Sequence, residues 1–315
     1  MSAAGMALRF RTGSKKLLLR VTFVDAPDSP PSTPTAEWER SRPNFFSLYR
    51  DGKYVASMAA LTHFEPQDVT IFDDTGIAAE AEIQVLLPFY YRNAEIILHS
   101  VGVERGAWLN KAAPRQRPRI FFHGDSITQG HGVTSPRETY VQQVADKLDC
   151  VGINYGFGGT AWADNVVAET IAARADWDVL VIMLGTNSFA GTDAQGKPET
   201  AAQYAEKYDA FIATIRATAP NKPILCVTPI LNRADLDRGG NHNGERPELY
   251  RDGITRVVKQ RQNADANRHL ANGLAMVNDP LFLLVTDRVH PNDAGMNRIA
   301  EGVATALKPL LAGLR

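Results

Sequence analysis

Short runs in which hydrophobic and polar residues alternate fill the first third of the chain. Bounded by turn residues, they predict β-strands at Leu17–Val24, Asn44–Leu48, Lys53–Met58, Asp68–Phe72, Ala81–Leu86 and Glu95–Val103. Asp51–Gly52 lies between two of these runs and is typical of a hairpin turn. No stretch in this region sustains the period of an amphipathic helix. The pattern therefore predicts an N-terminal β-sandwich, of jelly-roll type, over residues 1–112. Ala26–Pro34, which is rich in proline, is expected to be an exposed loop.

After a linker predicted at residues 113–118, strand patterns alternate with helical ones. Buried strands are expected at Arg119–His123, Val151–Tyr155, Val179–Leu184, Pro223–Thr228 and Leu274–Asn278. Helical periodicity is found at Arg137–Leu148, Asp164–Ala175, Ala201–Thr218, Pro247–Asn267 and Asp293–Leu314. This alternation predicts an α/β fold over residues 119–315, a three-layer α/β/α domain with a five-stranded parallel sheet.

Composition and charge exclude several classes of protein. The 315 residues, 44% hydrophobic and 22% charged, are enough to build two folded cores. The 34 basic and 35 acidic residues nearly cancel, which argues against a nucleic-acid partner. No apolar run approaches the roughly 20 residues of a membrane span, and no signal peptide opens the sequence, so we expect a cytoplasmic protein without a membrane partner. Cys150 and Cys226 are expected to be buried free thiols.

Glycine and polar residues follow the carboxyl ends of the predicted strands, where parallel sheets bind their ligands. Gly124–Thr128 follows the first strand and Gly156–Thr160 follows the second. Gly185–Ser188 follows the third, and Asp287–Pro291 comes after the last. A serine, a glycine loop, an asparagine and an Asp/His pair should thus meet at one edge of the sheet.

Together these residues supply the parts of an acyl-transfer site. Ser126 needs a base before it can act as a nucleophile, and His290 is the candidate base. Asp287, three residues earlier, is placed to fix the tautomer of the imidazole. The backbone N–H groups of Ser126 and Gly159 and the side-chain amide of Asn187 are candidate donors to an oxyanion. We therefore expect Ser126, Asp287 and His290 to be the catalytic residues.

Two other interpretations of these motifs find less support. Gly156–Ala161 fits a relaxed dinucleotide-binding pattern, but it follows the second strand of the domain rather than the first. His123, Asp125 and His131 are candidate metal ligands, but no second cluster of ligands supports them. We expect neither a cofactor nor a metal, and a small-molecule or carbohydrate ester as the substrate.

On these motifs the sequence resembles the SGNH (GDSL-type) hydrolase family. The resemblance covers roughly residues 118–313 and rests on blocks in the family's order, Gly124–Ile127, Asn154–Gly159, Gly185–Asn187 and Asp287–His290. The resemblance implies Ser126 as the nucleophile, His290 as the base and Asp287 as the carboxylate that orients it. It also implies an oxyanion hole formed by the N–H group of Ser126 with Gly159 and Asn187.

Two positions depart from the family's pattern. Ile127 stands where leucine is usual, which is a conservative change. Ser188 stands where aspartate is frequent, so a local hydrogen bond differs, but the expected role of Asn187 is unaffected.

The first half of the chain is similar to the N-terminal β-sandwich of two-domain SGNH enzymes, at Leu8–Thr12, Leu48–Gly52 and Leu87–Tyr90. That subgroup resembles carbohydrate acetyl esterases and an acyltransferase of polyketide tailoring. The resemblance implies a serine esterase that acts on short acyl esters, such as O-acetyl groups on a carbohydrate or similar small alcohol. The alternatives are an acyltransferase with the same acyl-enzyme and a carbohydrate-binding protein without catalysis.

Several residues near the predicted site are candidates to bind the substrate. They lie in the catalytic turns or in the polar loop 232–246, and they are Asp125, Phe157, Trp162, Phe189, Arg233, Asp235 and Arg238. Aromatic residues at such places are equally typical of a core. A polar loop of this kind is more typical of a solvated surface than of a binding site.

Overall fold

The structure, a computed structural model, describes two compact units. The described residues are 4–24, 44–60, 65–73, 80–89, 95–191 and 199–314. One unit comprises Met1–Gln116 with Thr134–Arg137, and the other comprises Arg117–Val133 with Glu138–Arg315. The first division point, between Gln116 and Arg117, lies inside the predicted linker. The predicted loop Ala26–Pro34, like Tyr90, lies outside the described residues.

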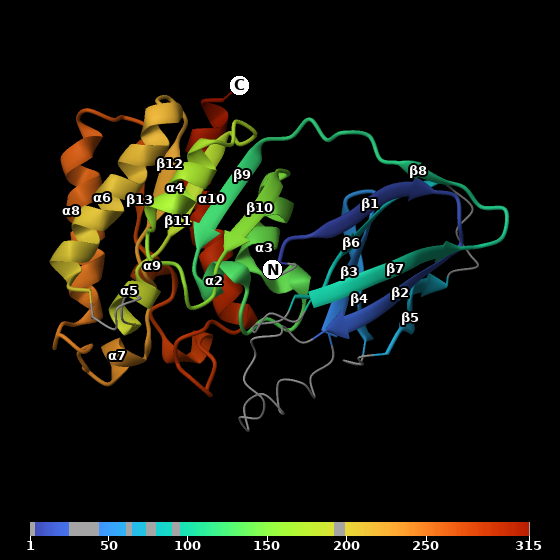
Figure 1. Ribbon diagram of the computed structural model, residues 1–315, viewed down its shortest axis with the longest axis horizontal. Helices are drawn as coiled ribbons and strands as arrows, with labels where there is room; N and C mark the ends of the chain where they lie inside the picture. Colours follow the sequence, from blue (N-terminus) through green and yellow to red (C-terminus); the bar gives the residue numbers. More distant parts are fainter. Residues whose placement is uncertain are drawn as a thin grey trace. The chain divides into compact units, whose positions relative to one another are not determined.

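The first unit contains two antiparallel sheets (Figure 1). One has the strand order β4-β3-β6-β1-β8, with β1 (Ala7–Thr12), β3 (Asn44–Arg50), β4 (Lys53–Ala60), β6 (Ala81–Leu86) and β8 (Leu109–Lys111). The other has the order β5-β2-β7, with β2 (Lys16–Val24), β5 (Gln67–Asp73) and β7 (Glu95–Val103). Side chains of both sheets fill one core, in which Leu19 of β2 and Val85 of β6 are fully buried. The predicted β-sandwich is therefore confirmed.

The hairpin between β3 and β4 forms as the sequence predicts. Asp51 and Gly52 both have positive φ angles, 50° and 78°, which the type I′ turn requires at its two central residues. Arg50 pairs with Lys53 directly across the turn. β8 was not predicted because its short sequence, Leu109–Lys111, is exposed throughout and has no apolar alternation.

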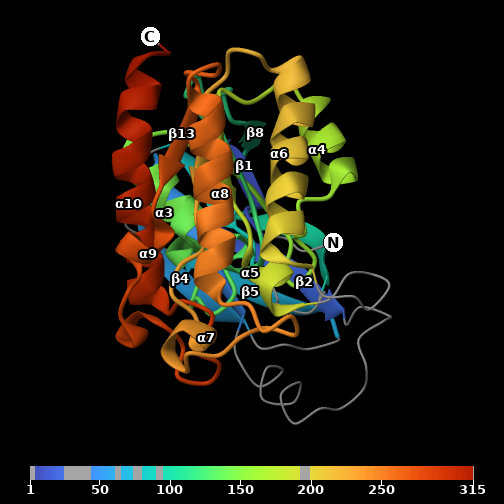
Figure 2. The same cartoon turned by 90° about the vertical axis from the view of Figure 1, so that its left-hand side faces the viewer.

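The second unit is a parallel sheet covered by helices on both faces (Figures 1 and 2). The strand order is β10-β9-β11-β12-β13, with β9 (Arg119–Gly124), β10 (Val151–Gly156), β11 (Val179–Met183), β12 (Ile224–Val227) and β13 (Arg268–Ala271). One face is covered by α4 (Asn165–Ala172), α6 (Ala201–Thr218) and α8 (Pro247–Gln262). The other is covered by α3 (Tyr140–Leu148) and α10 (Asp293–Ala312). The predicted three-layer α/β/α architecture is confirmed.

Among the described residues, six short helices lie in loops between the longer elements, and one of them, η1, begins in the segment Thr134–Arg137 of the first unit. They are α2 (Ser126–Gln129), η1 (Pro136–Glu138), α5 (Thr186–Ala190), α7 (Arg233–Leu236), α9 (Gly273–Met276) and η2 (Pro280–Phe282).

The central strand β11 shows why the sheet is stable between its two helical layers. Leu180 and Ile182 enter the core under α4, α6 and α8, whereas Val179 and Val181 enter the core under α3 and α10. All four are fully buried, as expected for a strand with helices on both faces.

The apolar pattern at Leu274–Asn278 predicts the last strand, and this prediction is wrong. Gly273–Met276 forms the helix α9, because the side chain of Asn272 caps it by accepting the N–H of Ala275. The edge strand β13 lies earlier, at Arg268–Ala271, and pairs in parallel with β12. Its first residue is a buried arginine, which an apolar pattern does not reveal. Because the pattern does not reveal β13, the helix predicted at Pro247–Asn267 continues beyond the actual end of α8 at Gln262.

Both cysteines are buried free thiols, as predicted. Burial raises the pKa of the Cys150 thiol to about 12 and that of Cys226 to about 11. Neither thiol is therefore ionised at neutral pH.

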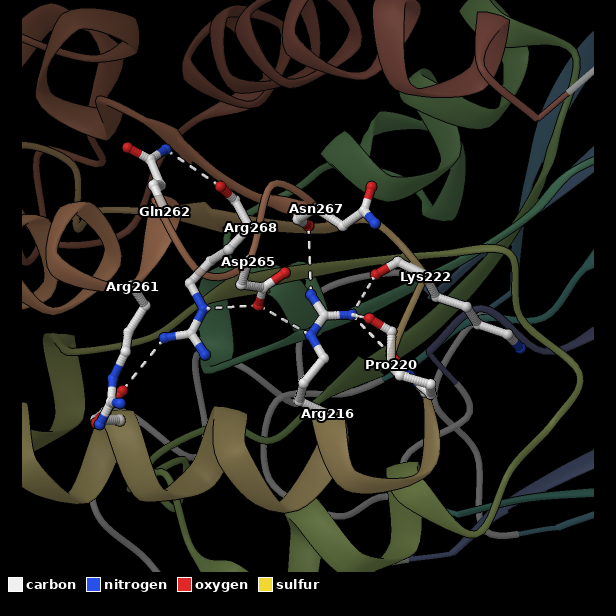
Figure 3. A network of polar contacts seen from close by, with 10 residues as sticks. Arg216, Pro220, Lys222, Arg261, Gln262, Asp265, Asn267 and Arg268 are labelled. Atoms are coloured by element: carbon white, nitrogen blue, oxygen red, sulfur yellow. Dashed lines mark hydrogen bonds and ion pairs between the residues drawn. The ribbon is translucent and has the colours of Figure 1, made fainter.

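An ion-pair network joins the amino ends of β12 and β13 to α6 and α8 (Figure 3). Asp265 accepts hydrogen bonds from Arg216 Nε at 3.0 Å and from Arg268 Nε at 3.3 Å. Asp209 accepts from Arg268 at 3.2 Å and from Arg261 at 2.6 Å. Arg216 also donates to backbone carbonyl oxygens of the turn before β12. The side chains of Arg268 and Asp265 are only 5% and 14% exposed, so these charges depend on one another.

Replacement of Asp265 by alanine is expected to lower the free energy of unfolding of the second unit by about 3 kcal/mol, because it leaves two buried guanidinium groups without their shared carboxylate. Urea unfolding measures the loss. Asp176 is the matched control, since it also binds two arginines, Arg119 and Arg174, but its side chain is 45% exposed. Asp176→Ala should cost less than about 1 kcal/mol. Equal losses in the two variants would contradict the structural role of the buried network.

Candidate active site

Ser126 lies directly after β9, where it begins the short helix α2. Asp125 caps this helix, because its side chain accepts the N–H of Ile127 at 2.9 Å. Burial raises the pKa of Asp125, against the opposing effect of its hydrogen bonds, including one from Thr186. With only 1% of its surface exposed, Asp125 holds the serine turn and does not face the solvent. A contact of Asp125 with the substrate stays a prediction.

A continuous hydrogen-bonded chain joins Ser126, His290 and Asp287. Ser126 Oγ lies 2.8 Å from His290 Nε2, and His290 Nδ1 lies 2.8 Å from Asp287 Oδ2. An ionised carboxylate can only accept, so Nδ1 carries the proton and Nε2 presents its lone pair to the serine hydroxyl. The structure thus brings the three predicted catalytic residues together in the geometry of a nucleophile, a base and an orienting carboxylate.

Asp287 is fixed by the backbone of its own loop. Its Oδ1 accepts the N–H of Val289 at 2.8 Å and that of His290 at 3.0 Å. Partial burial acts to raise the pKa of Asp287, but the hydrogen bonds from the ring and backbone of His290 and from Val289 outweigh it, and the pKa falls to about 2. Asp287 is therefore a carboxylate at neutral pH.

Two of the predicted oxyanion donors follow β10 and β11. Gly159 lies in the loop after β10, and Asn187 lies in the short helix α5 after β11. The side-chain oxygen of Asn187 accepts the N–H of Ala161 at 3.1 Å, which fixes the amide and leaves its NH₂ group as a donor. Gly159 has a φ angle of 74°, in the left-handed region that favours glycine. An added Cβ there would meet no atom within 4 Å. The backbone conformation, rather than a lack of space, accounts for glycine at this position.

A pocket of about 440 Å³ lies beside this site. Thr186 and Val289 line it, and they are the chain neighbours of Asn187 and His290. The remaining lining residues belong to α5 and to the segment that contains α7, and they are Phe189, Ala190, Asn232, Arg233, Ala234, Asp237, Gly239, Gly240, Asn241 and His242. Phe189 and Arg233 are among the predicted substrate contacts, whereas Asp237, Asn241, His242 and Val289 are not. The position of Val289 between Asp287 and His290 was the available signal.

Arg233 is an exposed member of the pocket lining. Its Nε donates to Asp237 at 3.1 Å, and Asp237 also pairs with Arg288 of the catalytic loop at 3.1 Å. This shared carboxylate connects the pocket wall to the loop that carries His290.

Two of the other loop candidates take structural positions instead. Asp235 binds the buried guanidinium of Arg251 through both carboxylate oxygens, at 2.8 and 2.6 Å. Phe157 packs edge-on against Tyr155, with ring centroids 4.6 Å apart. Neither is part of the pocket lining, and a substrate contact through either stays a prediction.

Trp162 and Arg238 also lie outside the pocket lining. The ring of Trp162 lies against Gly191, at the end of the helix α5 that carries Asn187. Arg238 is exposed to solvent, in agreement with the alternative interpretation of its loop as a solvated surface. A direct contact of either with the substrate stays a prediction.

The three candidate metal ligands of the sequence do not meet as a group. His123 is buried, bonds the carbonyl oxygen of Tyr155 through Nδ1 at 3.0 Å, and stacks on Phe211. Burial lowers the pKa of His123 to about 4, so it is neutral in the fold. His131 lies elsewhere, with its ring centroid 4.0 Å from that of His290. No sequence pattern indicates the contact between His131 and His290, because it joins residues far apart in the chain.

The fold and these residues agree with the comparisons to known proteins. The sequence profile of the GDSL-like lipase/acylhydrolase family matches residues 122–298. Comparison with curated protein sequences finds no match. Among the helices of the described ranges, none combines the length and apolar character of a membrane span.

Solved structures of similar fold cover nearly the whole chain. The salicylyl-acyltransferase SsfX3 from a tetracycline biosynthetic pathway has a TM-score of 0.79 and 21% identity, over 98% of this chain and 83% of its own. A family two carbohydrate esterase from Clostridium thermocellum, in complex with cellohexaose, has a TM-score of 0.67 and 16% identity, over 98% and 93%. The acetyl xylan esterase Est2A from Butyrivibrio proteoclasticus has a TM-score of 0.61 and 14% identity, over 97% and 89%. At these identities the likeness establishes the two-domain fold.

Proposed function

Since the chain belongs to the GDSL-like lipase/acylhydrolase family, we propose that it is a serine esterase that hydrolyses short-chain acyl esters, in particular O-acetyl groups on a carbohydrate or a similar small alcohol. The observation that carries the proposal is the hydrogen-bonded chain from Ser126 through His290 to Asp287. A hydroxyl becomes a competent nucleophile only when a base is held in this position.

In the first half of the proposed reaction, Ser126 Oγ attacks the ester carbonyl carbon while His290 Nε2 takes the hydroxyl proton. Asp287 stabilises the imidazolium that forms. The negative charge on the carbonyl oxygen is met by the N–H groups of Ser126 and Gly159 and by the NH₂ group of Asn187. His290 then protonates the alcohol oxygen, the bond from the carbonyl carbon to that oxygen breaks, and an acyl-enzyme remains.

In the second half, water replaces the alcohol. His290 takes a proton from the water, whose oxygen attacks the acyl carbon, and the same donors stabilise the second oxyanion. Proton transfer from His290 to Ser126 Oγ releases the carboxylic acid and restores the resting site.

The pocket beside the site supports a polar alcohol as the leaving group. The alcohol oxygen must lie close to His290 Nε2, because that atom protonates it, and Val289 of the pocket wall is the neighbour of His290. Asn232, Asn241 and His242 offer hydrogen-bonding groups to sugar hydroxyls, and the ring of Phe189 offers an apolar face. The carbohydrate substrates named for two of the similar structures are consistent with this choice.

An acyltransferase is the second candidate, and the similarity to SsfX3 favours it. Both reactions form the same acyl-enzyme and differ only in the acceptor that resolves it. A purely carbohydrate-binding role finds no support in the site, because binding alone does not require the assembled Ser126, His290 and Asp287.

A fluorophosphonate should label the native enzyme at Ser126, and peptide mass spectrometry locates the label. Protein unfolded in urea should not react, because Ser126 then lacks its base. In a series of p-nitrophenyl esters from acetate to octanoate, kcat/KM should be highest for acetate. Label on another residue would contradict the mechanism, and a preference for octanoate would contradict the short acyl group. With a sugar acceptor present, acetylated sugar in place of acetate would identify a transferase.

A further inference from the structure

His131 is held against the catalytic loop by the backbone on both sides of it. Its own N–H donates to the carbonyl oxygen of Ser126 at 2.8 Å. The next residue, Gly132, has a φ angle of 95°, and a Cβ there would lie 2.8 Å from the carbonyl oxygen of Pro291. The loop after α2 and the loop around His290 thus approach so closely that glycine is required between them. The imidazole rings of His131 and His290 meet at an interplanar angle of 65°.

The donor atoms of His131, Asp287 and His290 all lie within 4.8 Å of one another. In a tetrahedral site with Zn–N and Zn–O bonds of about 2.0–2.2 Å, the ligand atoms are about 3.4 Å apart. The three groups must therefore approach one another by up to about 1.4 Å, through changes in their side-chain torsion angles, to close around an ion. All three side chains are partly exposed, so an ion reaches them from the solvent.

The donor set selects the kind of metal. Two imidazoles and one carboxylate, with a fourth position for water, form a set that Zn²⁺ takes in catalytic sites. Mg²⁺ and Ca²⁺ prefer oxygen ligands throughout and should not compete. We propose that the protein binds one Zn²⁺ ion between His131, Asp287 and His290, and that this ion inhibits the esterase.

Inhibition follows from the ring nitrogen of His290 that the ion takes. Nδ1 faces Asp287 and Nε2 faces Ser126, so an ion shared with Asp287 binds Nδ1. A zinc ion on Nδ1 displaces the proton shared with Asp287, and the neutral imidazole then carries its proton on Nε2, where it blocks the proton transfer from Ser126. The inhibition rests on the proposed function, whereas the binding of zinc does not.

Calorimetric titration of the full-length protein with ZnCl₂ tests the binding. We expect one ion per chain, and an affinity at least about tenfold weaker in both His131→Asn and His131→Phe. The phenylalanine variant keeps a ring against His290 but has no ligand atom. The control is His99→Asn, because His99 is an exposed histidine of the first unit. The site would be overturned if the wild type does not bind zinc, or if both His131 variants bind it with the affinity of the wild type.

Ester hydrolysis tests the inhibition, with each variant compared to its own zinc-free rate. ZnCl₂ should inhibit the wild type and EDTA should restore it, whereas equal concentrations of MgCl₂ and CaCl₂ should have no effect. His131→Phe should need at least about tenfold more zinc for half-inhibition. If calorimetry shows that zinc binds, but the wild type hydrolyses esters at the same rate in its presence, the proposed inhibition is overturned. If the wild type hydrolyses no ester, the calorimetry still decides the binding, and the proposed function is what has failed.

Discussion

Alanine in place of Ser126 is expected to lower kcat for acetyl-ester hydrolysis by about 10⁵- to 10⁶-fold, because the nucleophile is lost while the pocket and the oxyanion donors remain. The acyl-enzyme cannot form, and what is left is the attack of water on a bound ester. Hydrolysis of p-nitrophenyl acetate measures the loss, with thermal unfolding to show that the variant is folded.

Ser188 provides the matched control for this substitution. It is buried next to Asn187, and within the described part of the chain its hydroxyl has no hydrogen-bond partner. Ser188→Ala should therefore change kcat by less than about twofold, since no polar partner is left unsatisfied. Unchanged hydrolysis by the Ser126 variant would exclude the serine mechanism.

The second large effect is expected at Asp287. Asparagine there should lower kcat by about 10⁴-fold with little change in KM, because the amide no longer stabilises the imidazolium and can hold the wrong tautomer of His290. The lowered pKa of Asp287, about 2, gives the sign of the pH dependence. A carboxyl with a depressed pKa keeps its charge until the pH falls towards that value, so acidification to pH 5 does not mimic the variant.

Asp279→Asn is the control for Asp287→Asn, because Asp279 lies in the same loop and caps η2 through the N–H of Leu281. Asparagine caps as well as aspartate does, so activity should be retained. A fall in kcat of less than about tenfold for Asp287→Asn would show that Ser126 and His290 work without the carboxylate.

Much of this site was predictable because parallel sheets bring the ends of their strands together. Ser126, Gly159 and Asn187 follow three strands that the apolar pattern identifies, so their meeting required only the fold class. His290 and Asp287 followed from chemistry, since a serine nucleophile needs a base and a base needs orientation. The β-sandwich was equally accessible, because its strands alternate and Asp51–Gly52 marks a hairpin.

The errors arise where tertiary contacts override the local pattern. β13 escaped detection because Arg268, a charged residue, is stabilised in the interior by Asp209 of α6 and by Asp265 of the preceding turn. The burial of Asp125 likewise depends on the surrounding fold and cannot be predicted from its place in the motif. The contact of His131 with His290 joins two loops 159 positions apart, which no local period encodes.

The two ends of the parallel strands have separate tasks, and this separation bears on how the enzyme can evolve. The charged network of Arg216, Asp265 and Arg268 lies where β12 and β13 begin, whereas Ser126 follows the carboxyl end of β9. A substitution of an exposed residue of the pocket segment, such as Arg233, leaves that network intact, so it draws little on the stability reserve of the fold. Lineages of this architecture can therefore explore new alcohols or acceptors through loop changes, while mutations at the opposite end are removed by selection for foldability.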